Sequence, residues 1–106
     1  MRIGMPVYNK AIRDRIPEII HESSQKCEIR VLSDDEFLPL LEVKLGEEIE
    51  EYLSSRSVVE LADLVEVVIR IAELRGVSRE ELEETRLCKR SARGGFENNL
   101  FLVRTY

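Results

Sequence analysis

The sequence predicts a mainly α protein, an antiparallel helix bundle with short terminal β segments, that assembles into an oligomer. Ser33, Ser57 and Ser78 each precede an apolar pattern of helical period and have a glutamate three residues later, as in a capping box at a helix start. The helix after Ser57 has apolar residues around most of its circumference, more than one neighbouring helix can cover. We therefore expect a homodimer or a larger assembly.

The N-terminal part of the chain is expected to contain little regular structure. Pro6 interrupts the first 16 residues, and Ile16 precedes a proline, which disfavours helical geometry. A short helix is expected over residues 17–24, with Pro17 at the favoured first position. Polar and apolar residues alternate over residues 27–32, which predicts a short strand.

Two long helices and a final shorter one are expected to follow. The first begins after Ser33, where Leu32 and Phe37 can form a hydrophobic staple. The second ends at Gly76, which can adopt the left-handed conformation that terminates helices. The last runs over residues 79–91, and the β-branched and aromatic residues of 100–105 predict a terminal strand.

Four carboxylates occupy mirrored positions on the two long helices. Glu48 and Glu51 are three residues apart, as are Glu60 and Asp63, so the members of each pair share a helix face. A hairpin folded about residues 54–57 brings Glu51 opposite Glu60 and Glu48 opposite Asp63. The sequence therefore predicts that the four acids converge.

The apolar stripe of the first long helix places Glu48 in an unusual position, inside the stripe rather than opposite it. The stripe contains Phe37, Leu38, Leu41, Leu45, Ile49 and Tyr52. On the second long helix, Glu60, Asp63 and Glu66 form one narrow acidic line among apolar residues. We expect this second helix to be central and mostly buried.

Carboxylates gathered in a partly desolvated place repel one another and need protons, cationic partners or a metal. Oxygen-only ligation suits a hard ion, so the sequence predicts a Mg(II) site that could also take Mn(II). Two alternatives remain open. Acidic runs on helices are usually solvated, and a capping box between Ser57 and Glu60 would tie the Glu60 carboxylate to a backbone donor.

Length and composition limit the number of domains, the kinds of partner and the expected location of the protein. A chain of 106 residues predicts one domain, and a net charge of −5 argues against nucleic-acid binding. Its apolar runs are too short to span a membrane. Cys27 and Cys88 have no CxxC spacing and the N-terminus does not resemble a secretory leader, so we expect a cytoplasmic protein. His21 is the only histidine, which excludes a histidine-rich metal cluster.

Two basic segments have a structural and a functional interpretation. Lys10, Arg13, Asp14 and Arg15 form either solvated surface or a set of groups positioned for a phosphorylated ligand. Gly94 and Gly95 either end a helix or let the backbone approach an anion beside nearby basic residues. Those nearby residues are Lys89, Arg90 and Arg93.

Four segments together resemble the all-α nucleoside triphosphate pyrophosphohydrolase superfamily, the MazG and phosphoribosyl-ATP pyrophosphohydrolase-like group. They are NKAIRDRIPEII, KLGEEIEEYL, ELADLVEVV and RGGF, and the resemblance spans Tyr8 to about Leu102. The family pattern EExxE followed by ExxD is matched by Glu47, Glu48 and Glu51 and then by Glu60 and Asp63. Only eight residues separate Glu51 from Glu60, fewer than in many MazG-type members.

The resemblance implies a single all-α domain over residues 1–106 that hydrolyses a nucleotide between its α- and β-phosphates and forms dimers or larger assemblies. It implies that magnesium is bound by four acids, which are Glu48, Glu51, Glu60 and Asp63. Glu47 or a carboxylate-bound metal would then orient the attacking water, and Glu47 and Glu48 are the catalytic candidates. Lys44, Arg90 and Arg93 are the candidates for binding phosphate oxygens.

Three functions remain open from the sequence. The first is hydrolysis of a nucleoside triphosphate to a monophosphate and pyrophosphate, including the house-cleaning of noncanonical nucleotides. The second is phosphoribosyl-ATP hydrolysis in histidine biosynthesis. The third is a non-catalytic helical oligomerisation or binding module, against which the intact EExxE and ExxD patterns argue.

Overall fold

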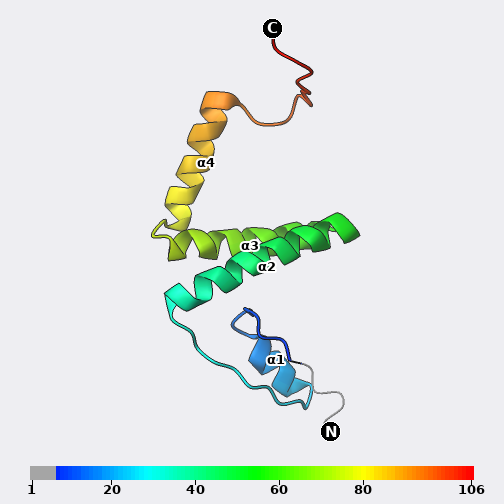
Figure 1. Cartoon of the computed structure of the whole chain (residues 1–106), viewed down its shortest axis with the longest axis vertical. Coiled ribbons are helices and arrows are strands. Elements are labelled where there is room, and N and C mark those ends of the chain that lie inside the picture. The colour runs from blue at the N-terminus through cyan, green and yellow to red at the C-terminus, as the bar shows by residue number, and fades with distance from the viewer. Residues whose placement is uncertain (1–6) are drawn as a thin grey trace.

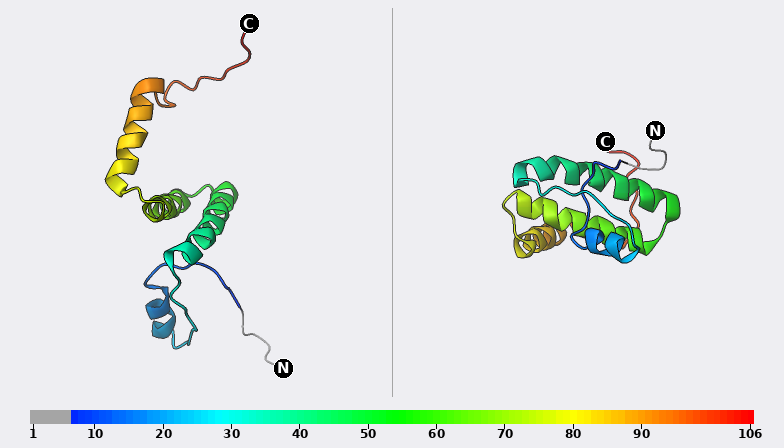
Figure 2. Two further views of the ribbon diagram at one scale, coloured as in Figure 1. Left: turned by 60° about the vertical axis from the view of Figure 1, so that its left-hand side comes forward. Right: turned by 90° about the horizontal axis from the view of Figure 1, so that it is seen from below.

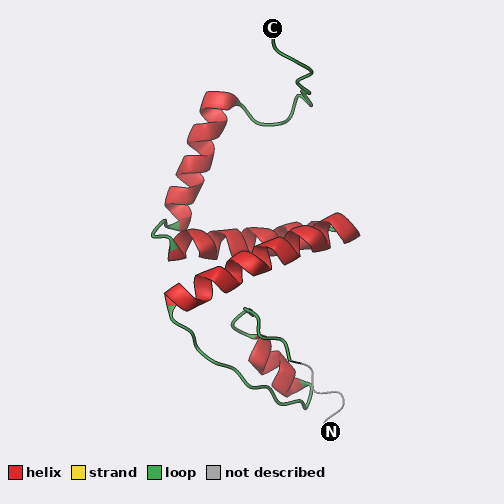
Figure 3. Ribbon diagram, viewed as in Figure 1, coloured by secondary structure: helices red, strands yellow, loops and turns green. Residues whose placement is uncertain are grey.

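The computed structural model describes residues 7–106 and is mainly α-helical, as predicted (Figure 1, Figure 3). Its helices are α1 (Ile16–Glu22), α2 (Asp34–Ser55), α3 (Val58–Leu74) and α4 (Arg79–Arg93). No helix within residues 7–106 is both long and apolar enough to cross a membrane. The part of the predicted irregular segment that covers residues 1–6 lies outside the described residues.

The predicted strands at residues 27–32 and 100–105 are wrong, because residues 7–106 contain no strand. A strand is stabilised by hydrogen bonds to a neighbouring strand, and alternation of side chains cannot supply that neighbour. Both segments are irregular, and apolar side chains in each of them, such as Val31 and Phe101, are exposed.

Local capping determines where the helices begin. The Ser33 hydroxyl accepts from the Glu36 N–H at 3.2 Å and the Glu36 carboxylate accepts from the Ser33 N–H at 3.2 Å, which confirms the predicted capping box. At α4, the Ser78 hydroxyl accepts from the Glu81 N–H at 3.1 Å without the reciprocal bond. Helix α4 runs to Arg93, slightly beyond its predicted end.

Helices α2 and α3 form the antiparallel hairpin that the sequence predicts (Figure 1, Figure 2). Arg56 and Ser57 make up the whole connection, and Arg56 adopts a left-handed conformation with φ 59° that reverses the chain. Only a small core lies along this hairpin. It consists of the buried Ala11, Leu41 and Val67, with Phe37, Leu40, Leu45, Ile71 and Leu74 packed against them.

The predicted bundle is present only as this helical pair, because α4 leaves the end of α3 and points away from the hairpin (Figure 1, Figure 2). The radius of gyration is 18.6 Å, whereas a compact chain of this length has about 13 Å. The accessible surface is 9751 Å², against about 6,100 Å² for a compact monomer of this mass. The single chain therefore leaves much of its apolar surface in contact with solvent.

The expectation that α3 is mostly buried is wrong for the single chain. Val67 is its only buried residue, whereas Val58 is 75% exposed and Val65 is 55% exposed. Helix α3 packs along α2 on one face and contacts α4 only near its C-terminal end (Figure 1). The N-terminal segment also reaches α3, through Ala11 beside Val67 and Arg13 on Asp63. Much of the remaining apolar surface of α3, including Val58 and Val65, stays exposed.

Candidate functional site

The packing of α2 explains why Glu48 is buried. Leu41, Leu45 and Glu48 are spaced by four and then three residues, which places them on one face of α2. Leu41 lies in the core on that face and Leu45 packs against it. Glu48 is 6% exposed, which confirms that it belongs to the apolar stripe of its helix.

The hairpin brings three of the four predicted acids into one cluster. Glu48, Glu60 and Asp63 each offer a carboxylate oxygen, and these three oxygens lie within 4.8 Å of one another. Glu51 is exposed and is not the fourth member of this compact set, but its carboxylate lies close enough to interact with both Glu48 and Glu60. The mirrored spacing in the sequence therefore corresponds to a real convergence of acids.

Burial and mutual repulsion make this cluster unfavourable for negative charge. Burial raises the pKa of Glu48, the charges of Glu51 and Asp63 raise it further, and only Lys44 opposes them. Desolvation also raises the pKa of Glu60, again with contributions from Glu51 and Asp63. Negative charge on Glu48 and Glu60 therefore costs the folded protein free energy, which for Glu48 the nearby Lys44 offsets in part.

The capping alternative for Glu60 is not realised. The Ser57 hydroxyl accepts from the Val59 N–H at 3.2 Å, and the Ser57 N–H donates to the Ser55 hydroxyl at 3.2 Å. The backbone donor that a capping box would use for Glu60 is thus already bonded to Ser55. The Glu60 carboxylate takes part in the acidic cluster instead.

One oxygen of Glu48 lacks a partner. Its Oε2 atom is buried and accepts no hydrogen bond from residues 7–106. The Lys44 ammonium lies 3.8 Å from the other oxygen, Oε1, which is an ion-pair distance but longer than a hydrogen bond. A buried carboxylate oxygen is costly to hold in its charged form unless a proton, a donor or a cation satisfies it.

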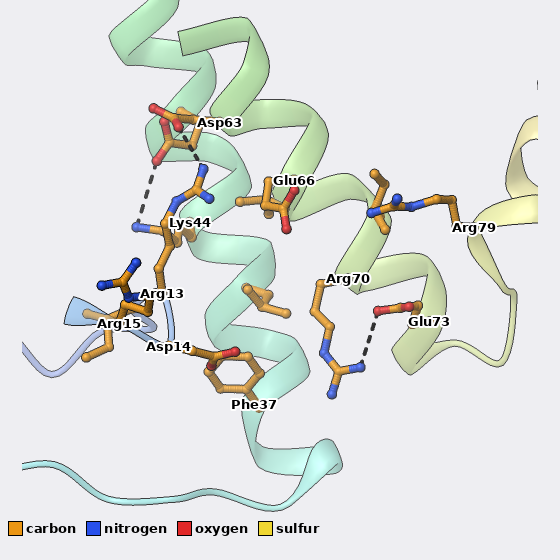
Figure 4. Close-up of a pocket in the computed structure, with 15 residues that line it drawn as sticks. Arg13, Asp14, Arg15, Phe37, Lys44, Asp63, Glu66, Arg70, Glu73 and Arg79 are labelled. Atoms are coloured by element: carbon orange, nitrogen blue, oxygen red, sulfur yellow. Dashed lines mark hydrogen bonds and ion pairs between the residues drawn. The ribbon is translucent and has the colours of Figure 1, made fainter. Parts of the chain in front are cut away.

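A cavity of about 640 Å³ opens beside the acidic cluster (Figure 4). Its volume is in the range usual for small-molecule sites. The N-terminal segment, α2, α3 and the first residue of α4 contribute to its wall. The lining residues are Ile12, Arg13, Asp14, Arg15, Phe37, Leu41, Lys44, Glu48, Asp63, Glu66, Val67, Ile69, Arg70, Glu73 and Arg79.

Of the predicted residues Lys44, Arg90, Arg93 and Glu47, one lines the cavity and three do not. Lys44 lines the cavity. Arg90 and Arg93 lie on the last turn of α4, where Arg90 pairs with Glu97, outside the cavity wall. Glu47 is half-buried on α2 and is also outside the wall. The roles assigned to Glu47, Arg90 and Arg93 stay predictions.

Gly94 has the structural role that the sequence allowed. It follows the last residue of α4 and adopts φ 84°, a conformation that glycine tolerates without a steric penalty. The double glycine therefore ends the helix and lets the chain turn.

Sequence reasoning missed the contact of Arg13 with the acidic cluster. The Arg13 guanidinium donates from Nη2 to Asp63 Oδ1 at 2.7 Å, although the residues are 50 positions apart in the chain. It also missed Phe37, Arg70 and Arg79 as parts of the cavity wall. The basic segment around Arg13 was the only signal, and its spacing does not indicate which surface it contacts.

Comparisons with known proteins leave the family open. No protein-family model matches the chain. An uncharacterised protein of Mycolicibacterium smegmatis is 52% identical over 40 residues, which cover 38% of this chain and 41% of that protein. The match thus spans about two fifths of the length of this curated relative. No solved structure matches the chain.

Proposed function

We propose that the protein is a magnesium-dependent nucleotide pyrophosphohydrolase that converts a nucleoside triphosphate into a monophosphate and pyrophosphate. The observation that carries the proposal is the buried, unpartnered Oε2 atom of Glu48 within a cluster of three carboxylates. A cluster of acids on a surface has many explanations. A buried carboxylate oxygen without a partner needs a proton, a donor or a cation, and the proposal assigns that role to a bound cation.

The available donors fit a hard divalent cation. Every candidate ligand is a carboxylate oxygen, the donor type that Mg(II) prefers and that Mn(II) also accepts. Glu48, Glu60 and Asp63 would hold the ion, with Glu51 at the edge of the set. A bound ion of this kind would neutralise charge on the phosphate oxygens of the substrate.

The cavity beside the cluster supports a phosphorylated substrate. Lys44, Arg13 and Arg15 line it together with the apolar side chains of Phe37 and Leu41. Basic groups next to the acids can bind phosphate oxygens, and the apolar wall can cover the less polar part of the ligand. In the proposed reaction, the water oxygen bonds to the α-phosphorus and its proton passes to solvent, while the bond from the α-phosphorus to the bridging oxygen breaks and pyrophosphate leaves with that oxygen. Glu47 is proposed to orient this water.

The exposed face of α3 supports self-association. Val58, Leu61, Val65 and Val68 are all exposed and follow one another at spacings of three, four and three residues. This is the spacing of a helix-packing seam. The accessible surface exceeds that of a compact monomer by roughly 3,600 Å², more than a standard interface buries in total. We propose that a second copy of the chain covers this seam.

A screen for pyrophosphate release tests the proposed activity. The protein is incubated with Mg(II) and a panel of nucleoside triphosphates, noncanonical nucleotides and phosphoribosyl-ATP. We expect Mg-dependent release from at least one triphosphate and none after chelation. Preferential cleavage of phosphoribosyl-ATP would assign the protein to histidine biosynthesis instead. Absence of release from every compound would contradict the enzymatic proposal and favour a binding module.

A further inference from the structure

The side chain of Arg13 neutralises one of the acids that the proposed function assigns to a metal. Its guanidinium donates one hydrogen bond to Asp63, at 2.7 Å, from the irregular segment that precedes α1. Lys44 forms the other cationic contact to the cluster, at 3.8 Å from Glu48. Figure 4 shows Arg13, Lys44 and Asp63 gathered at the same end of the cavity. The cluster is therefore partly neutralised by cations of the chain itself.

We propose that Arg13 is a displaceable cation: it pairs with Asp63 while no divalent ion is bound, is released when the ion takes Asp63, and then binds the phosphate chain of the nucleotide. This inference rests on the proposed function, because it takes a divalent ion and a triphosphate as the ligands of this site. It adds a residue, Arg13, that couples the arrival of the metal to the binding of the substrate.

The geometry of the ion pair allows release. Arg13 uses a single N–H group rather than the two-pronged contact of a strong arginine–carboxylate pair, and its side chain is 52% exposed. Partly exposed pairs of this kind are among the weaker ones in proteins. Lys44 is a poorer candidate for release because its side chain is largely buried and it lies on the same helix as Glu48, one turn away.

The backbone around Arg13 keeps the released side chain inside the cavity. Ala11, two residues earlier, is buried in the core with Leu41 and Val67, and Ile12 lines the cavity wall. A change of side-chain rotamer therefore moves the guanidinium while the segment stays on the hairpin. The phosphates would bridge the metal and the nearest cation, and the planar guanidinium matches phosphate oxygens well.

A static brace is the alternative role for Arg13, and triphosphate binding separates the two roles. If Arg13 only held the N-terminal segment on α3, its removal would relieve charge repulsion on the metal but leave triphosphate binding close to that of the parent. If Arg13 competes with the metal, its removal strengthens metal binding. If it also binds phosphate, the same removal weakens triphosphate binding.

The test uses the full chain and two probes, Mn(II) alone and inorganic triphosphate at saturating Mg(II), each titrated by calorimetry. Relative to the parent, we expect Arg13→Ala to bind Mn(II) about two- to fivefold more tightly, the range that partly exposed ion pairs contribute. We expect the same variant to bind triphosphate about tenfold more weakly, as for a lost charge-assisted hydrogen bond. Arg13→Lys keeps the charge and should fall between the parent and Arg13→Ala for both probes.

The matched control is Arg75→Ala. Arg75 is an exposed arginine that pairs with Glu42 at 3.1 Å and does not line the cavity, so its loss changes the net charge equally but should leave both affinities unchanged. Circular dichroism checks that the helices remain, and Arg13→Gln replaces Arg13→Ala if they do not.

The outcomes separate the inference from the proposed function. A parent protein that binds no Mn(II) would refute the metal site itself. A parent that binds Mn(II), with Arg13→Ala binding it equally or more weakly, would refute only the displacement by Arg13. Tighter Mn(II) binding with unchanged triphosphate binding would refute the phosphate role.

Discussion

Replacing Glu48 by glutamine should stabilise the metal-free protein and abolish its stabilisation by magnesium. The substitution keeps the side-chain shape but removes a charge from a residue that is 6% exposed and has one unpartnered oxygen. An unsatisfied buried group costs about 1–3 kcal/mol and more when charged, and the neutral amide avoids part of this cost. Since Lys44 lies 3.8 Å away, losing that attraction offsets only part of the gain. We expect a net increase of about 1 kcal/mol in the free energy of unfolding.

Magnesium should reverse which of the two proteins, the parent or Glu48→Gln, has the higher melting temperature. A gain of about 1 kcal/mol raises the melting temperature by about 4–8 °C in a domain of this size. The parent gains about 2.7 kcal/mol from Mg(II) at one hundred times its dissociation constant, whereas the variant should gain almost none. Thermal melts followed by circular dichroism, with chelator and with Mg(II), measure both quantities. The variant should melt higher in chelator and the parent higher in Mg(II).

The control is Glu50→Gln, which removes the same charge from an exposed position of α2. Its melting temperature should stay close to that of the parent, and its response to Mg(II) should be retained. If Glu48→Gln melted below the parent in chelator and still gained stability from Mg(II), the reasoning from the unpartnered oxygen would be refuted.

Three further predictions concern activity, assembly and capping. Asp63→Asn should abolish Mg-dependent pyrophosphate release while the helical signal in circular dichroism is retained; full activity in this variant would remove Asp63 from the site. Val65→Asp should lower the mass measured by light scattering from that of a dimer or larger assembly to that of a monomer. The control Val31→Asp, in an exposed loop, should leave the mass unchanged. A parent protein that is already monomeric would contradict the seam on α3. Ser33→Ala should cost about 1 kcal/mol in thermal melts at pH 7. Hydrogen bonds from the Ser33 N–H and the Ser33 hydroxyl lower the pKa of Glu36. Ser33→Ala keeps the N–H and removes the hydroxyl, which donates to the Glu36 carboxylate and accepts from the Glu36 N–H. The part of the difference that comes from the hydroxyl–carboxylate bond is present above the ordinary value of 4.5 and is lost as pH falls below it, so the difference between the two proteins should narrow in acid without vanishing; an unchanged difference at low pH would exclude that bond from the cap.

Features that depend on local chemistry could be predicted from the sequence. The start of α2 follows from Ser33 and Glu36, which satisfy each other's backbone donors within one turn. The burial of Glu48 follows from helical periodicity, and its approach to Asp63 follows from two acid pairs equidistant from a short turn. These inferences need only the geometry of a helix and the length of a connection.

Features that depend on distant partners could not be predicted in the same way. The apolar pattern of α3 shows that a large area needs covering, but not whether the same chain covers it, and Val58 and Val65 remain exposed. The alternation at residues 27–32 indicates a strand only where a second strand is available. The pairing of Arg13 with Asp63 joins positions 50 residues apart, and no periodicity relates them.

The helical hairpin of α2 and α3 also restricts where the chain can change in length during evolution. A helix turns by about 100° per residue, so one residue gained or lost between Val58 and Asp63 would rotate Asp63 away from the other carboxylates. Residues added between Arg56 and Ser57 would instead lengthen a surface loop, which proteins tolerate at little free-energy cost. Homologues that retain the cluster should therefore keep three residues of spacing within each acidic pair and vary in length between the pairs only at the connection between α2 and α3.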